Sequence, residues 1–207
     1  MPALTLPAPP RCRATTYGLD PSAYRFSLAQ YDRMVESGIL TPEDRVELLE
    51  GYLVTKMGAT EPHDVALNLV SNTLLRLMPA GWTWRAQQAI ALANSKPEPD
   101  FALVRGGIRD YRHRKPGPAD FGILVEISDS SLARDRDDKL PLYAEAGIPI
   151  YWIVNIPDSC VEIHEQPTGS NPNPGYAVNN VYRTGDMVPI VLDGVTLGTV
   201  PAADLIP

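Results

Sequence analysis

The sequence predicts an α/β fold in which helices flank a central mixed β-sheet and a β-rich tail is added at the C-terminus. Two continuous apolar runs, Phe101–Val104 and Gly122–Ile127, are typical of central strands that are covered on both faces. Segments with helical periodicity alternate with these strands, and from Cys160 onward only strands and turns are expected. The chain has 207 residues, of which 44% are hydrophobic and 21% charged, and this composition favours a packed domain over global disorder.

The first hundred residues begin with a segment that shows no periodicity. Residues 1–22 are rich in Pro, Ala and Arg, so we expect a poorly ordered leader before a single domain over residues 23–207. Apolar side chains at helical or alternating spacing, bounded by capping and turn residues, then mark the elements. In order, these are a helix from the N-cap Ser27 through Glu36, closed at Gly38; two strands within 45–57 around a Glu50-Gly51 turn; a helix over 62–78, closed near Gly81; and strands at 82–87 and 89–93.

The second half of the chain alternates strands, one helix and turns. After the two apolar runs a helix is expected over Arg134–Ala146, because Gly147 follows it as a C-terminal stop signal. Short strands bounded by Gly, Pro and Asn then follow. They are expected at 148–156, 161–164, 176–182, 187–190 and 195–197.

Charge and cysteine content exclude several classes of protein. A formal net charge of −7 argues against a protein that coats nucleic acid non-specifically, although a small basic patch remains compatible with it. Cys12 and Cys160 form no CxxC motif, so neither a disulfide scaffold nor a cysteine zinc site is expected. There is no apolar run of about 20 residues and no basic-then-apolar start, so we expect a cytoplasmic protein without a membrane span.

The candidate chemistry lies in acidic residues at strand ends. Asp100 directly precedes one apolar run, and Glu126 lies near the end of the other. Carboxylates on adjacent central strands can converge, and Mg²⁺ binds through one or two carboxylates while keeping waters or phosphate oxygens as other ligands. The alternative is that both residues form turns or surface ion pairs. Sequences typical of nucleotide-hydrolysing P-loops, dinucleotide-binding folds, esterases and zinc proteases are absent.

Lys139 extends this pattern. Only four of the 18 basic residues are Lys, and a lysine ammonium suits a position that holds a water molecule near a phosphate. Asp135 and Lys139 also have i, i+4 spacing, so an ordinary exposed helix ion pair is the alternative.

The segment Leu124–Val154, LVEISDSSLARDRDDKLPLYAEAGIPIYWIV, resembles the Uma-type family of restriction-endonuclease-like proteins, which belongs to the PD-(D/E)XK nuclease superfamily. Upstream, Glu47–Gly51, then His63, then Pro99-Asp100 follow in the order found in that family, and the resemblance extends from about residue 26 to 201. The resemblance implies a restriction-endonuclease-like core, with a central mixed sheet flanked by helices.

Site residues follow from the same resemblance. Asp100 matches the Asp of the PD motif and Glu126 the acidic residue of the (D/E)XK motif, and Glu47 matches an additional upstream carboxylate; all three are implied metal ligands. Ser128 stands where the superfamily motif has Lys, and the family supplies its Lys from the next helix, here Lys139. The resemblance gives His63 no defined role, and a structural one is as compatible with its position.

The resemblance also implies an activity. It would be a DNA endonuclease that uses Mg²⁺, with Mn²⁺ as a substitute, and acts as a homodimer, with Asp100, Glu126, Glu47 and Lys139 as catalytic residues. Ser128 could act directly, but a structural role for Ser128–Ser131 in capping the helix that carries Lys139 is favoured.

A basic connection between the two apolar runs is the candidate nucleic-acid contact, expected to emerge next to the metal site. A solvated loop is the alternative. Its cationic residues are Arg105, Arg109, Arg112, Arg114 and Lys115.

Two other functions stay open. One is a catalytically silent module that keeps a nuclease fold for interaction with proteins or nucleic acid. The other is a metal phosphoesterase acting on RNA or a small nucleotide, because metal and lysine would act on the phosphodiester rather than on the base.

Overall fold

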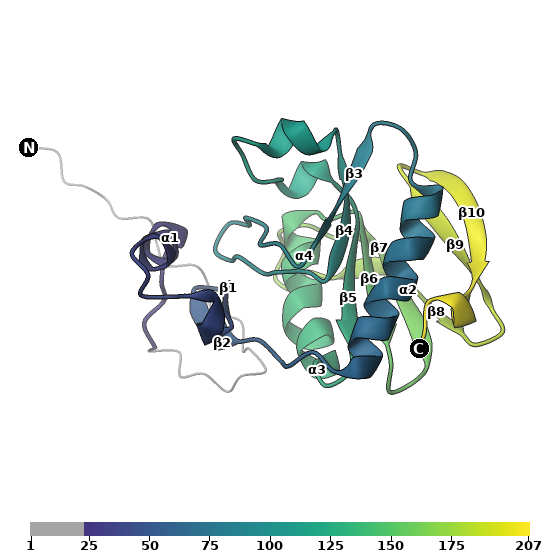
Figure 1. Cartoon of the computed structure of the whole chain (residues 1–207), viewed down its shortest axis with the longest axis horizontal. Helices are drawn as coiled ribbons and strands as arrows, with labels where there is room; N and C mark the ends of the chain where they lie inside the picture. Colours follow the sequence, from purple (N-terminus) through teal and green to yellow (C-terminus); the bar gives the residue numbers. More distant parts are fainter. Residues whose placement is uncertain (1–22) are drawn as a thin grey trace, which may run out of the picture.

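A six-stranded mixed sheet forms the centre of the protein, as predicted (Figure 1). The computed structural model describes residues 23–207, so the leader expected over residues 1–22 lies outside the described part and the domain boundaries stay predictions. Neighbouring strands are antiparallel except for β5 and β6, which are parallel. In spatial order the strands are β3 (Trp82–Ala86), β4 (Phe101–Arg105), β5 (Phe121–Ser128), β6 (Ile150–Asn155), β7 (Cys160–Pro167) and β8 (Tyr176–Arg183).

A helical crossover makes the parallel pair possible, because two parallel strands cannot be joined by a tight hairpin. It consists of a single helical turn, α3 (Leu132–Arg134), a π-helical turn at Asp135–Lys139, and α4 (Leu140–Ala146). Gly147 ends this segment with φ 77°, which confirms the predicted stop. The crossover therefore starts directly after the carboxyl end of β5.

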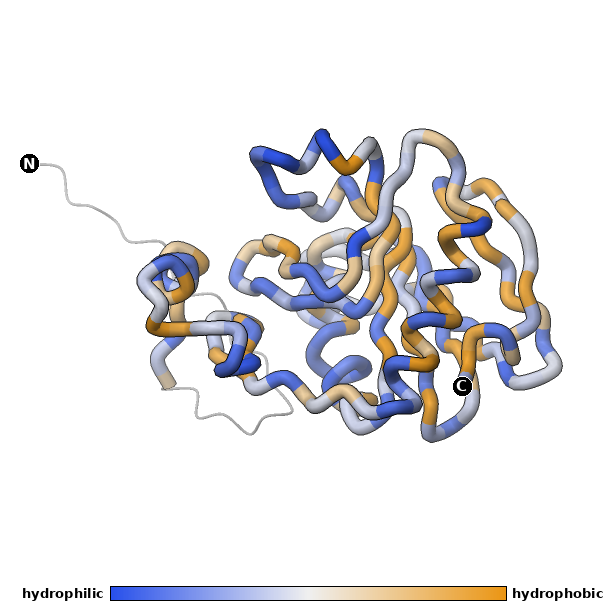
Figure 2. Tube along the Cα trace, in the orientation of Figure 1, coloured by the Kyte–Doolittle hydropathy of each residue, from blue (hydrophilic) through white to orange (hydrophobic). Residues whose placement is uncertain are grey.

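Two hydrophobic layers cover the sheet. One face packs against α2 (Glu61–Leu77) and the hairpin of β9 (Met187–Leu192) and β10 (Val195–Pro201). The other packs against α4 and the hairpin of β1 (Val46–Leu49) and β2 (Tyr52–Thr55). Figure 1 shows α2, β9 and β10 on one side of the sheet and α4 on the other, and Figure 2 shows hydrophobic residues along the strands between them. All eight residues of β5 are buried, which explains why its sequence is mainly apolar and shows no alternation of apolar and polar residues.

The N-terminal elements follow local signals. Helix α1 (Leu28–Glu36) begins at Ser27, whose side chain forms a reciprocal capping box with Gln30, so the predicted cap is confirmed. The strand pair at 46–55 and helix α2 also form where they were predicted, within one or two residues.

Two expectations about strands need correction. The segment 89–93 forms no strand; it folds into a loop in which Ile90 N–H donates to the Pro97 carbonyl. Pro97 and Pro99 have no N–H, so this part of the chain cannot continue a ladder beside β3. The C-terminal strands are only partly an appendage, since β7 and β8 complete the central sheet and β9–β10 cover one face of it.

Within residues 23–207 no helix is both long enough and apolar enough to cross a lipid bilayer.

Gly122 offers a test of the packing between β5 and the C-terminal hairpin. A Cβ atom at this position would overlap Leu192 Cδ1 and lie 2.5 Å from Trp82 Cζ3. We therefore expect Gly122→Ala to lower the free energy of unfolding by about 1–3 kcal/mol, measured by urea denaturation. Gly198→Ala is the matched control, because its new Cβ would meet Leu77 at an ordinary 3.5 Å; equal losses in both variants would contradict the packing argument.

Candidate active site

The antiparallel pairing of β4 with β5 brings two acidic side chains together. Phe101 pairs with Val125 in antiparallel register, so Asp100, which precedes Phe101, lies opposite Glu126, which follows Val125. Asp100 Oδ2 accepts a hydrogen bond of 2.8 Å from the backbone N–H of Ile127, which fixes the carboxylate against β5. The structure thus places both predicted metal ligands at the same end of β4 and β5.

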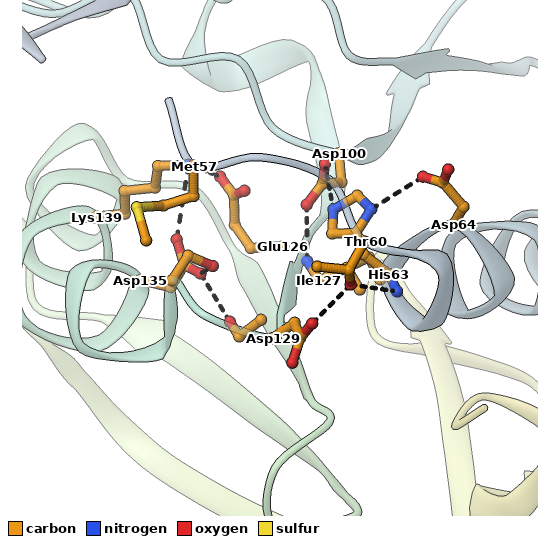
Figure 3. Close-up of polar contacts among 12 residues, drawn as sticks. Met57, Thr60, His63, Asp64, Asp100, Glu126, Ile127, Asp129, Asp135 and Lys139 are labelled. Atoms are coloured by element: carbon orange, nitrogen blue, oxygen red, sulfur yellow. Dashed lines mark hydrogen bonds and ion pairs between the residues drawn. The ribbon is translucent and has the colours of Figure 1, made fainter. Parts of the chain in front are cut away.

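The side chain of Lys139 extends from the π-helical turn to this end of the strands (Figure 3). Its ammonium nitrogen Nζ lies 3.0 Å from Glu126 Oε1, 3.6 Å from Asp135 Oδ1 and 3.8 Å from Glu47 Oε1. All four side chains are buried. The exposed i, i+4 pair considered for Asp135 and Lys139 is therefore excluded; the pair faces inward.

Glu47 lies on β1, and the carboxylate oxygen that does not face Lys139 is held by a backbone group. Oε2 accepts a 3.1 Å hydrogen bond from the backbone N–H of Glu98, in the loop that precedes β4. The hairpin of β1 and β2 thus adds a third carboxylate beside Lys139. Glu47, the third predicted metal ligand, therefore lies in the same cluster as Glu126.

Tyr143 is a contact of Glu126 that the sequence did not identify. Its hydroxyl donates a 2.7 Å hydrogen bond to Glu126 Oε1, and both groups are buried. Tyr143 lies four residues after Lys139, which itself lies four residues after Asp135. This repeated i, i+4 spacing is the sequence signal that could have placed all three on one face.

Burial sets the protonation of the cluster. Removal from water raises the pKa of the Glu126 carboxyl well above its usual value, and the neighbouring carboxylates add to this effect against the opposing Lys139 charge. Burial alone would lower the pKa of Lys139, but Glu126, Glu47 and Asp135 outweigh it and raise that pKa well above its usual value. Lys139 therefore stays a cation and a hydrogen-bond donor at neutral pH.

His63 lies beside Asp100 at the start of α2. Its Nε2 is 3.2 Å from Asp100 Oδ1, while Nδ1 is 3.4 Å from Asp64 Oδ1. The hydrogen bond to Asp100 is the main cause of a raised pKa for His63, although its partial burial opposes the shift. His63 therefore orients Asp100 through Oδ1, while Ile127 N–H holds the other carboxylate oxygen.

The serines at 128 and 131 do not cap the crossover helix as expected. Ser131 occupies the N-cap position but makes no side-chain capping bond. Instead Ser128 Oγ and Ser131 Oγ donate to Asp135 Oδ2 over 2.7 and 2.6 Å. Oδ1 of the same carboxylate accepts no hydrogen bond from the described residues. The serines thus orient Asp135, which in turn faces Lys139, and Ser128 acts through this carboxylate.

The π-helical turn was not anticipated from the sequence. Leu140 N–H donates to the Asp135 carbonyl, a bond that spans five residues. Pro141 has no N–H for an ordinary helical bond at the next position, so it marks the point where the turn widens. Asp135 and Lys139 are the two buried residues of this turn.

An ion pair anchors the outer side of this turn to β7. Arg136 contacts Glu162 through two hydrogen bonds of 2.5 and 3.1 Å, and Asn155 Nδ2 donates to the same carboxylate over 2.7 Å. Although burial by itself raises the pKa of Glu162, His164, Arg136 and Asn155 together lower it to about 2. The turn that carries Lys139 is therefore tied to the sheet by a carboxylate that stays ionised.

This lowered pKa predicts an acid-dependent loss of stability. Glu162 stabilises the fold fully above its unfolded pKa, and the contribution disappears as the pH falls from about 4.5 to about 2. We expect the wild type to exceed Glu162→Gln by about 2–3 kcal/mol in free energy of unfolding at pH 6, with the difference closing towards pH 2. Urea unfolding over this pH range, with Glu165→Gln as control, measures it; a constant difference would contradict the assignment.

The clustered side chains open into a cavity of about 340 Å³. Besides the central carboxylates and Lys139, its wall includes His63 and Asp129, whose carboxylate accepts a 2.6 Å hydrogen bond from Thr60. Basic side chains also line it, namely Arg45, Lys56 and Arg134. Its size lies within the range of small-ligand sites, so one nucleotide unit can enter.

The basic connection predicted next to the site lies elsewhere. It joins the far ends of β4 and β5, about 16 Å along the strand from Asp100, at the top of Figure 1. Figure 2 shows it as a largely hydrophilic segment. Arg105 forms an ion pair with Asp193, and Arg114 with Asp120. The loop that joins β4 and β5 lies at the end of these strands opposite to Asp100 and Glu126, so Arg109 and Arg112 lie away from the site. Lys115 lies nearer to the segment before β4, since its pKa is lowered by burial and is also influenced by the charges of Lys96 and Glu98.

Known proteins share this sequence pattern and this fold. A family model named Uma2, described as "Putative restriction endonuclease", matches residues 28–199. A crystal structure described as a "putative nuclease belonging to DUF820" from Anabaena variabilis is similar in fold, with a TM-score of 0.64 and 12% identity, covering 87% of this chain and 97% of that one. Among curated proteins, no match was found.

Proposed function

The chain belongs to the Uma2 family of putative restriction endonucleases, and we propose that it is a metal-dependent endonuclease that hydrolyses phosphodiester bonds of DNA. The observation that carries this proposal is the contact of the buried Lys139 ammonium with Glu126, 3.0 Å apart, beside Asp100 in one cavity. The family and its fold support a nuclease. The metal, the DNA substrate and the residue roles are the proposed part.

The donor set suits Mg²⁺, with Mn²⁺ as a substitute. Within residues 23–207 no three His, Cys, Asp or Glu side chains converge as a preformed metal cluster. Mg²⁺ needs only one or two carboxylates, because it keeps waters or substrate oxygens as its other ligands. Asp100 and Glu126 provide such hard oxygen donors, and Glu47 lies next to them.

The charge of the cavity supports the same conclusion. Among the described lining residues, six carboxylates face four Lys or Arg side chains. A phosphodiester entering this cavity would meet net negative charge, and a divalent cation offsets that repulsion. When bound, Mg²⁺ would polarise the phosphodiester and lower the pKa of a water molecule.

The chain's own groups supply positioning and proton contacts. Lys139 donates hydrogen bonds to the attacking water and to the phosphate oxygens on which negative charge develops. Tyr143 holds Glu126, while Ile127 N–H and His63 hold Asp100, so both carboxylates are oriented before substrate arrives.

Calorimetric titration of Mg²⁺ and Mn²⁺ tests the proposal first. The wild type is expected to bind metal in the presence of a DNA fragment, and Asp100→Ala and Glu126→Ala are expected not to bind. Asp137→Ala, an exposed carboxylate on the same turn, is the control and should bind as the wild type does. A wild type that binds neither ion would favour the alternative of a catalytically silent nuclease-fold module.

Three further properties are proposed from the sequence, two of them from the family resemblance and the location from the absence of a signal peptide and of an apolar run long enough to span a membrane. They are homodimerisation, a cytoplasmic location and preference for DNA over RNA or a small nucleotide. Sedimentation analysis would test the first, and cleavage of matched DNA and RNA strands the last.

A further inference from the structure

Three cationic side chains converge on one short segment at the wall of the cavity. Arg134 Nη1 donates to the Thr55 carbonyl over 2.7 Å, and Arg45 Nη2 donates to the Met57 carbonyl over 3.1 Å. Lys56 lies between these two acceptors, and its backbone N–H donates to the Arg45 carbonyl over 2.7 Å. Arg45 and Lys56, which flank the β1–β2 hairpin, and Arg134 of α3 therefore line the same cavity.

The chemistry of these contacts suits an anion. Among residues 23–207 Arg45 has no carboxylate partner; it contacts the neutral Met57 carbonyl, which orients the guanidinium without cancelling its charge. Lys56 forms an ion pair with Glu98. Glu98 lies next to the carboxylate cluster, because its backbone N–H donates to Glu47. A guanidinium fixed in this way is suited to bidentate contact with a phosphate.

The location connects this cluster to the reacting centre. Arg45 precedes Glu47 by two residues in the chain, and Arg134 directly precedes Asp135. All three cationic side chains line the same cavity as Glu126 and Lys139. A phosphate bound by these cations and a phosphate bound at the carboxylates would therefore belong to the same strand in the cavity.

We propose that Arg45, Lys56 and Arg134 form a phosphate subsite that holds the phosphate next to the one being cleaved, so that a strand with at least two neighbouring phosphates is bound in preference to a ligand with one. This inference rests on the proposed nuclease function and specifies its substrate class. It assigns nucleic-acid contact to the cavity wall instead of the distant loop that carries Arg109 and Arg112.

Binding of a fluorescein-labelled single-stranded oligonucleotide in EDTA tests the subsite without cleavage. Anisotropy titrations at several salt concentrations give the slope of log K against log salt, whose magnitude decreases by about 0.7 for each phosphate that a single strand no longer neutralises. We expect Arg45→Ala, Lys56→Ala and Arg134→Ala each to weaken binding and flatten this slope. Arg109→Ala and Arg112→Ala, both exposed in the distant loop, are matched controls and should leave it unchanged.

Competition by short ligands tests the adjacent-phosphate assignment. A dinucleotide with a 5′-phosphate, which carries two phosphates, should displace the oligonucleotide at least about tenfold better than a 5′-mononucleotide. In Arg45→Ala this preference should disappear; because Arg45 is exposed, loss of folding does not confound the comparison, and a thermal melt confirms it.

The outcomes separate this inference from the proposed function. Unchanged slopes in the three cavity variants, or a flattened slope in the loop variants, would overturn the subsite, as would equal competition by the two short ligands. Subsite-dependent binding by a wild type that cleaves nothing with Mg²⁺ or Mn²⁺ would support the subsite and overturn the nuclease proposal. If the wild type cleaves DNA but the three cavity variants bind the oligonucleotide as the wild type does, the nuclease proposal is supported and the subsite is overturned.

Discussion

Replacing Lys139 with Met is expected to lower the free energy of unfolding by about 3–5 kcal/mol and to abolish cleavage, because it removes the central cation from a buried group of carboxylates. Among the described residues, Glu126, Asp135 and Glu47 all lie within 4 Å of Nζ. Without the ammonium, these side chains either repel one another or take up protons. Urea denaturation at pH 7, together with a DNA cleavage assay, measures both effects.

A second substitution distinguishes charge from packing. In Lys139→Met/Asp135→Asn one buried carboxylate becomes neutral, so we expect the double variant to recover part of the lost stability but none of the activity. Lys115→Met is the control, because Lys115 lies in the exposed connection between β4 and β5. Full wild-type stability in Lys139→Met would show that the buried cluster is not held together by this charge.

The fold could be predicted where a local signal coincided with burial. The mainly apolar sequence of β5 predicts a strand covered on both faces, and all eight of its residues are buried. Ser27 begins one helix and Gly147 ends another for reasons that operate within one turn of backbone. The segment 89–93 misled because its alternating Ala, Ile and Leu suggested a strand, whereas the prolines that follow remove the donors for a ladder.

The site was less predictable because its parts depend on geometry between elements. Strand-end positions were enough to place Asp100 beside Glu126. Spacing alone could not decide whether Asp135 and Lys139 faced inward, since an exposed pair has the same i, i+4 pattern. The π-helical turn and the anchoring of Asp135 by Ser128 settle that question, and neither leaves a distinct mark in the sequence apart from Pro141.

The basic connection shows a different kind of error. Arg105 to Lys115 lie between two site residues in sequence, but proximity in the chain does not bring this connection close to the site in space. A hairpin reverses that relation: Asp100 and Glu126 lie at the open end of β4 and β5, and the connection lies at the closed end. The cationic residues at the cavity come instead from the β1–β2 hairpin and α3, which are distant from each other in sequence.

Glu126→Gln is expected to separate stability from activity. Burial raises the pKa of the Glu126 carboxyl well above its usual value, so its buried charge carries a cost that opposes the attraction to Lys139. Gln is the neutral isostere, and its amide oxygen can still accept the hydrogen bond from Tyr143. We therefore expect the free energy of unfolding at pH 7, measured in EDTA, to be unchanged or higher by about 1–3 kcal/mol.

Cleavage should respond in the opposite direction. An amide is a much weaker ligand for Mg²⁺ than a carboxylate, so activity is expected to fall at least about a hundredfold. Glu126→Ala is the comparison, because it also removes the acceptor for Tyr143 and leaves a buried void; it should lose both activity and stability. If Glu126→Gln were several kcal/mol less stable than the wild type, the carboxylate would be part of the structural framework, and its burial would no longer indicate a functional site.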